Sequence, residues 1–159
     1  MSGKSIEIDD EQLGHLMECL LIQYKLHPES STFVIVSDYW EKPAEDCRSF
    51  IYIQFSGVEE FARERGLNRA AQAFVEEYRT RDVVGATVFQ AVKAFPEGEG
   101  GTRVEFWFGP AFGGVSFKCR EYSAWIRVAR ARQKGTDWEY RDVTTGDVVD
   151  FYNPFGERH

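Results

Sequence analysis

The side chains best suited to chemistry are four carboxylates that lie close together in residues 38–46. Such a group could bind a cation or supply a general acid and base, although its spacing differs from the alternating ligands of a calcium loop. Two large aromatic residues lie among these acids, a combination that suits docking onto a basic protein surface. We therefore predict a partner-binding surface here, with a solvated acidic loop as the alternative. The predicted residues are Asp38, Tyr39, Trp40, Glu41, Glu45 and Asp46.

Histidine and cysteine form no catalytic or metal-binding pattern. A histidine base needs a partner side chain and a pocket, and the three histidines lie on a helix face, in a proline turn and at the last residue. The cysteines lack the close spacing of a zinc site. We predict no catalytic residue, no metal and no cofactor. Of the three thiols, only that of Cys47 is a candidate for reactivity, because Cys47 is expected to lie in a loop. The residues considered are His15, His27, His159, Cys19, Cys47 and Cys119.

A basic strip at residues 118–134 contrasts with the acidic stretch. Six Lys and Arg residues stand against one acid, Glu121, with Tyr122 and Trp125 between them. Such a strip could contact single-stranded nucleic acid, or it could pair with the acidic half of its own chain and protect a sheet edge. The net charge of −7 repels nucleic acid, so we favour the internal role. The basic residues are Lys118, Arg120, Arg127, Arg130, Arg132 and Lys134.

Two helical segments are predicted in the N-terminal half. Asp9 or Asp10 can cap a helix that continues to about Lys25, because its apolar residues follow helical spacing. A Ser-x-x-Glu capping box at Ser56 starts a second helical segment, about 56–78, as one kinked helix or two. The first apolar stripe, expected to face the core, is Leu13, Leu16, Met17, Leu20, Leu21 and Tyr24.

The rest of the chain predicts antiparallel strands. Thr32–Ser37 and Arg48–Phe55 are predicted to pair across the acidic loop. Residues 123–134 fit either a strand or a helix, and the neighbouring strands favour a strand. The glycine-rich stretches 98–101 and 109–114 lack phosphate-loop spacing and are expected to be connections. Six strands are predicted after residue 83: Ala86–Phe95, Thr102–Phe108, Val115–Glu121, Ala124–Ala131, Trp138–Val143 and Val148–Tyr152.

The length of 159 residues and the balanced composition predict one α+β domain over residues 6–159, after a disordered stretch at 1–5. Its expected architecture is a mainly antiparallel sheet packed by the N-terminal helix and the second helical segment. The start of the sequence lacks the apolar core of a signal peptide, and apolar runs are too short for a membrane span. An odd number of widely spaced cysteines suits a reducing compartment, so we expect a cytoplasmic protein.

These features predict a non-catalytic acidic module that docks on a basic protein such as a toxin or a nucleic-acid-acting enzyme. Residues 1–80 carry 15 acids against 8 bases, so the net charge belongs to that half. In size, acidity and aromatic content the chain resembles immunity and other small inhibitor proteins, without sharing a motif. The alternative is a small-molecule-binding or enzymatic domain with an aromatic-lined pocket. Its candidate lining is Trp107, Tyr122, Trp125, Trp138 and Tyr140.

Overall fold

The computed structural model describes residues 3–67 and 84–156, and strands make up 60% of this part of the chain. The helical turns are α1 (Asp10–Leu13), η1 (Gly14–Leu16) and η2 (Pro28–Ser30). The strands are β1 (Lys4–Ile6), β2 (Leu20–His27), β3 (Thr32–Tyr39), β4 (Cys47–Ser56), β5 (Glu59–Arg65), β6 (Val84–Val88), β7 (Ala91–Pro96), β8 (Thr102–Trp107), β9 (Gly113–Cys119), β10 (Glu121–Lys134), β11 (Asp137–Asp142) and β12 (Val148–Val149).

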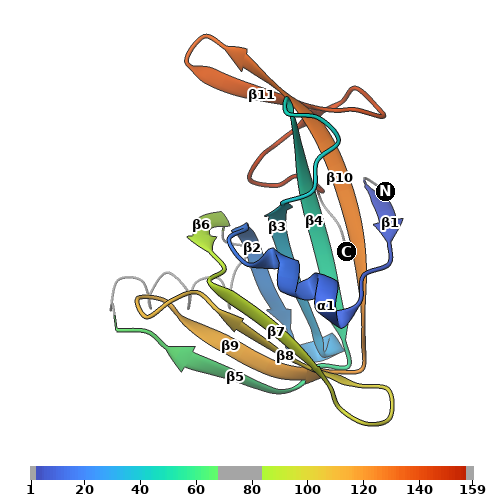
Figure 1. Ribbon diagram of the computed structural model, residues 1–159, viewed down its shortest axis with the longest axis vertical. Coiled ribbons are helices and arrows are strands. Elements are labelled where there is room, and N and C mark those ends of the chain that lie inside the picture. The colour runs from blue at the N-terminus through green and yellow to red at the C-terminus, as the bar shows by residue number, and fades with distance from the viewer. Residues whose placement is uncertain (1–2, 68–83, 157–159) are drawn as a thin grey trace.

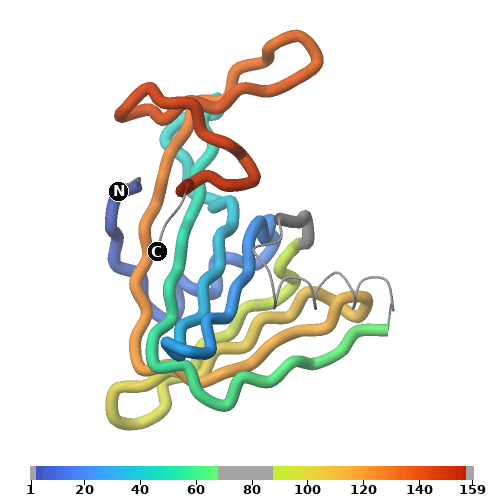
Figure 2. The backbone as a smooth tube through the Cα atoms, turned by 180° about the vertical axis from the view of Figure 1, so that it is seen from behind, coloured from blue at the N-terminus to red at the C-terminus, as the bar shows by residue number. Residues whose placement is uncertain are grey.

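The strands form two antiparallel sheets, one of them curled into a half-barrel. The larger sheet has the order β12-β11-β10-β4-β3-β2-β6, and β1 also pairs with β10. The smaller sheet has the order β5-β9-β8-β7. After β4 the chain enters the smaller sheet as β5, adds β6 to the far edge of the larger sheet and completes the smaller sheet with β7, β8 and β9. It then returns as β10 beside β4, so that Ser56 pairs with Glu121. Figure 2 shows this return, with β4 and β10 side by side.

The protein is mainly β, which corrects the predicted α+β fold. The predicted N-terminal helix is wrong beyond Leu16, because Leu20–His27 form β2 between β3 and β6. A register shift lies between Leu21 and Gln23. A β-bulge adds one residue to a strand, so residues three apart face the same side. Leu21 and Tyr24 accordingly enter the same core, a spacing that imitates a helix.

The second predicted helix is also wrong where the structure describes it. Glu59–Arg65 form β5, which pairs with β9, so sheet pairing overrides the helix propensity of this Glu- and Arg-rich segment. Residues 68–78 of that prediction lie outside the described residues. At the N-terminus, Lys4 and Ser5 belong to β1, within the stretch expected to be disordered.

Most strand predictions in the C-terminal half are confirmed, with changed boundaries. The ambiguous stretch 123–134 is strand, as part of β10. Ala86–Phe95 is divided between β6, which joins the larger sheet, and β7, which joins the smaller one. The last predicted strand is shorter and contains only Val148 and Val149. The predicted pairing of 32–37 with 48–55 is confirmed by the antiparallel register of β3 and β4.

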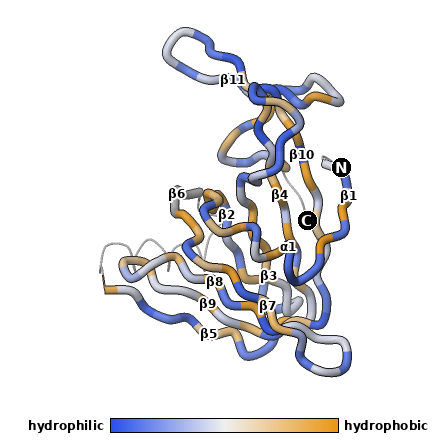
Figure 3. Tube along the Cα trace, viewed as in Figure 1, coloured by the Kyte–Doolittle hydropathy of each residue, from blue (hydrophilic) through white to orange (hydrophobic). Residues whose placement is uncertain are grey.

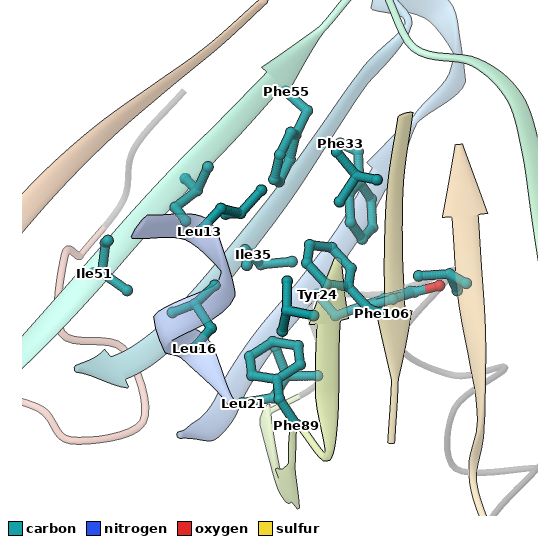
Figure 4. Close-up of a cluster of buried hydrophobic side chains, with 14 of the residues drawn as sticks. Leu13, Leu16, Leu21, Tyr24, Phe33, Ile35, Ile51, Phe55, Phe89 and Phe106 are labelled. Atoms are coloured by element: carbon teal, nitrogen blue, oxygen red, sulfur yellow. The ribbon is translucent and has the colours of Figure 1, made fainter. Parts of the chain in front are cut away.

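The main core lies between the two sheets and beneath α1 and η1. Figure 4 shows Leu13 and Leu16 with Phe33 and Phe106 in this core, and all four are buried. A second core on the other face of the larger sheet is covered by the C-terminal segment, where Phe155 packs on Tyr52 with ring centroids 5.6 Å apart. Figure 3 shows that much of β5 and the far end of the β10–β11 hairpin are hydrophilic.

Candidate functional site

The six predicted partner-binding residues divide into two groups in the structure. Asp38 and Tyr39 belong to β3, which is longer than predicted, and Tyr39 is buried. Trp40 and the acids after it lie on the β3–β4 loop and are exposed. The loop is therefore shorter than residues 38–47, and two of the six side chains are held within the fold.

Asp38 joins the end of β3 to the start of β2. Its Oδ1 accepts a hydrogen bond from the Leu20 amide at 2.5 Å, and its Oδ2 lies 3.9 Å from the guanidinium of Arg48. Burial raises the pKa of Asp38, because it outweighs the hydrogen bond from Leu20 and the charge of Arg48. Asp38 thus positions the strands rather than presenting its charge to solvent.

Trp40 is the large aromatic residue that the loop presents to solvent, with 55% of its surface exposed. Its ring is held from two sides. His15 of η1 meets it edge-on with centroids 5.5 Å apart, and the Tyr39 ring lies 5.8 Å away. His15 in turn accepts a hydrogen bond at its carbonyl from the thiol of Cys19 at 3.7 Å. An indole oriented in this way loses little freedom when a partner covers it.

The turn between η1 and β2 adds two residues that the sequence analysis did not assign to this site. Met17 was expected in the buried stripe but is 55% exposed, and Glu18 beside it is also exposed. Glu18 adopts a φ of +70°, and its amide donates to the Phe89 carbonyl at 2.7 Å. This turn lies next to Trp40 through the contact between the His15 and Trp40 rings. Met17, Glu18, Trp40, Glu41 and Glu45 are called the Trp40 surface below.

Asp46 faces the basic strip rather than standing free. Its carboxylate lies 3.1 Å from Nε of Arg130, and its carbonyl accepts from the Ala131 amide at 2.7 Å. Lys118 likewise pairs with Glu60 at 3.6 Å and with Glu97 at 3.2 Å. These contacts support the expectation that the basic strip pairs with acids of its own chain.

The cysteines do not form a reactive or metal-binding group. Cys47 begins β4 and is 5% exposed, so the expectation that it lies in an open loop is wrong. Burial raises the pKa of Cys19 and that of Cys119 to about 11 each. In the part of the chain that the structure describes, no three His, Cys, Asp or Glu residues are grouped to hold a metal ion.

The five aromatic residues considered for a ligand pocket lie in separate places. Trp107 lines a hollow on the outer face of the smaller sheet, whereas Trp138 and Tyr140 line a groove beside the β10–β11 hairpin. Trp125 packs against Tyr52 in the second core, with ring centroids 5.7 Å apart. Tyr122 donates a hydrogen bond to Asp10 at 2.7 Å. These residues therefore do not line one pocket.

Within the described residues, no helix is long and apolar enough to span a membrane. Comparisons with protein-family models, with curated proteins and with solved structures find no match.

Proposed function

We propose that this protein is a non-catalytic binding module that covers a basic surface of another protein, as an inhibitor does. The observation that supports this proposal is the exposure of Trp40, whose ring is held by His15 and Tyr39 within a group of acids. Tryptophan at the centre of an interface often provides a large part of the binding energy. The Trp40 surface is the proposed contact region.

The residues of this surface would have different effects on binding kinetics. Glu18, Glu41 and Glu45 are exposed, so they act at a distance and mainly raise the rate of association with a basic protein. Trp40 and Met17 make contact only after docking, when water leaves the interface. They therefore mainly slow dissociation.

A binding experiment with matched variants tests the proposal. Candidate partners captured from a lysate are retained only if the wild type binds them directly as purified proteins in surface plasmon resonance. Trp40→Ala should raise the dissociation rate and weaken affinity by about 2 kcal/mol. Glu41→Gln with Glu45→Gln should slow association most at low salt, because salt screens exposed charges.

Phe95→Ala provides the control, because Phe95 is 45% exposed on β7. Its variant should bind with wild-type kinetics. Unchanged kinetics in the Trp40 variant and in the double Glu variant would remove the Trp40 surface from the interface and overturn the proposal.

A further inference from the structure

The β10–β11 hairpin extends beyond the rest of the larger sheet and has two different faces. Figure 1 shows β11 and the end of β10 extending away from the body of the molecule. Strand alternation places Arg132 and Arg141 on one face. Trp138 and Tyr140 lie on the opposite face, where they pair with Gln133 and Ala131. Asp137 and Glu139 share the face of Arg132 and Arg141, so the hairpin is charged on one face and aromatic on the other.

The aromatic face forms one side of a surface groove. Trp138 and Tyr140 line it from β11, and Val148, Phe151 and Tyr152 line it from β12 and the segment that follows. Trp138 is 58% exposed and Tyr152 is 56% exposed, although both are large aromatic side chains. The rings are closely arranged: Phe151 lies 5.6 Å from Tyr140 and 5.2 Å from Tyr152. We call this the hairpin groove.

The charged residues of the hairpin groove are three acids and one base. The base, Lys134, already pairs with Glu139 at 3.1 Å, and Arg141 pairs with the same carboxylate at 2.7 Å. Within the described residues, neither Asp137 nor Asp150 has an ion-pair partner. Asp137 lies opposite Lys134 in the register, on the face away from Trp138. The groove thus combines aromatic faces with the carboxylate of Asp150. That composition attracts a cation, because aromatic faces and carboxylates both carry negative potential.

The same aromatic cluster already holds one guanidinium of this chain. The Cζ atom of Arg48 lies over the Phe151 ring, 5.2 Å from its centroid. Arg48 reaches this ring from β4, while Tyr140 and Tyr152 approach it from other elements. The ring cluster is therefore built in a way that accepts a planar cation.

We propose that the hairpin groove binds an arginine side chain of a partner polypeptide. The guanidinium would stack on Trp138 or Tyr152, and its N–H groups would donate to Asp150. Arginine suits the groove better than lysine, because a planar guanidinium both stacks on rings and bonds to carboxylates. The groove lies apart from the Trp40 surface, and the proposal does not depend on that surface.

The test uses a short glycine peptide carrying one arginine, followed by the indole N–H signals in two-dimensional NMR. The chain has four tryptophans, so four indole signals are expected, and variants assign them. The Trp138 signal should move in a saturable way, with an affinity on the order of millimolar for one side chain. A peptide with citrulline, which has the same shape but no charge, should bind roughly fivefold or more weakly.

Four variants separate the contributions of the ring, the carboxylate and the Trp40 surface. Trp138→Ala should abolish binding and Trp138→Phe should restore part of it, because a ring face returns. In these two variants the indole signal is lost, so binding is followed by the arginine side-chain signals of the peptide. Asp150→Asn should weaken binding severalfold while keeping the oxygen that accepts the Tyr152 amide at 3.0 Å. Trp40→Ala should bind the peptide like the wild type. Circular dichroism and the melting temperature check that each variant is folded.

Several results would overturn the proposal. Equal binding of the citrulline peptide, or of a leucine peptide, would make the groove a general apolar docking site. Movement of the Trp138 signal with phosphatidylserine-containing vesicles, but not with the arginine peptide, would indicate a membrane contact instead. An arginine response confined to the Trp40 signal would reject the hairpin groove and leave the proposed function standing.

Discussion

Arg127 donates its Nε–H to the Oδ2 atom of Asp142 at 2.6 Å, although the two side chains are only 11% and 8% exposed. The pair joins β10 to the end of β11. Arg127 also donates to the Pro154 carbonyl at 2.8 Å, which connects the pair to the C-terminal segment. The other oxygen of Asp142 accepts from the Thr144 and Thr145 amides, so one aspartate organises the turn that leads to β12.

Asp142→Asn is expected to destabilise the protein by about 3 kcal/mol, because it leaves the buried Arg127 charge without its partner. Asp137→Asn, an exposed change on the same strand, should stay within about 0.5 kcal/mol of the wild type. Urea unfolding of both variants at pH 7 measures the difference. Equal stability of the two variants would show that Arg127 does not need the carboxylate.

Low pH should weaken the contact between Arg127 and Asp142. Burial alone would raise the pKa of Asp142, but hydrogen bonds from Arg127 and the two threonine amides outweigh it and lower that pKa. A lowered folded-state pKa stabilises the protein above the unfolded-state value of about 3.9, and this stability is lost as the pH falls through the folded-state pKa. The difference in the free energy of unfolding between the wild type and Asp142→Asn should therefore become smaller below about pH 4. A difference that stays constant to pH 2 would contradict this.

Asp38→Asn should not destabilise the protein as Asp142→Asn does. The raised pKa of Asp38 means that folding disfavours its charged form, and asparagine keeps the oxygen that accepts the Leu20 amide. At pH 7 we expect an unchanged stability or a gain of up to about 1 kcal/mol, and at pH 3 no difference, since Asp38 is then protonated. Urea midpoints at the two pH values measure this. A loss above about 1 kcal/mol at pH 7 would show that the pairing with Arg48 dominates.

Gly113 and Gly98 allow the effect of crowding around a glycine to be separated from the effect of its positive φ. Both have a positive φ, +80° at Gly113 and +58° at Gly98. A Cβ at Gly113 would collide with the Glu64 carbonyl and the Gly66 amide, whereas at Gly98 it would meet no described atom within 4 Å. Gly113→Ala should cost about 3 kcal/mol or more and Gly98→Ala about 1 kcal/mol, measured by thermal unfolding. Equal costs would contradict the close packing of β5 on β9.

The three thiols should be unreactive in the folded protein. All three are buried, and with a pKa of about 11 only roughly one in a thousand Cys19 or Cys119 groups is ionised at pH 8. A thiol-reactive disulfide reagent should release no chromophore at pH 8 before unfolding and three equivalents in denaturant. Fast reaction of one native thiol, assigned by replacing Cys47 with serine, would restore the original expectation for that residue.

The sequence predicted which residues are buried better than it predicted the helices and strands that contain them. Leu13, Leu16, Leu21 and Tyr24 were expected in the core and are buried there. They come from a short helical turn and from a bulged strand. A bulged strand can have the same spacing of apolar residues as a helix, so the sequence alone does not distinguish the two. Where apolar and charged residues alternate strictly, as in the predicted strand Thr102–Phe108, the strand was predicted correctly, and Val104 and Phe106 on its apolar side are buried.

The candidate site was also predicted only in part, because the ends of the strands were misplaced. The exposed position of Trp40 follows from its place in a loop between two strands. The burial of Tyr39 depends on two further pairs, Asp38 with Phe50 and Tyr39 with Ser49, which extend β3 past the expected end. Met17 could not be assigned to the surface, because its place in the apolar stripe indicated burial. The edge-on contact between His15 and Trp40 brings the turn with Met17 beside the loop.

The pairing of Ser56 with Glu121 has a consequence for synthesis of the chain on the ribosome. The sheet neighbour of β4 on that side is translated only after residues 57–120, a delay of roughly 3–13 s at about 5–20 residues per second. During this interval β4 is an open edge whose Phe50 and Tyr52 still lack their cover from the C-terminal segment. Nascent chains arrested before residue 121 should therefore recruit chaperones or aggregate, whereas chains released at full length should not.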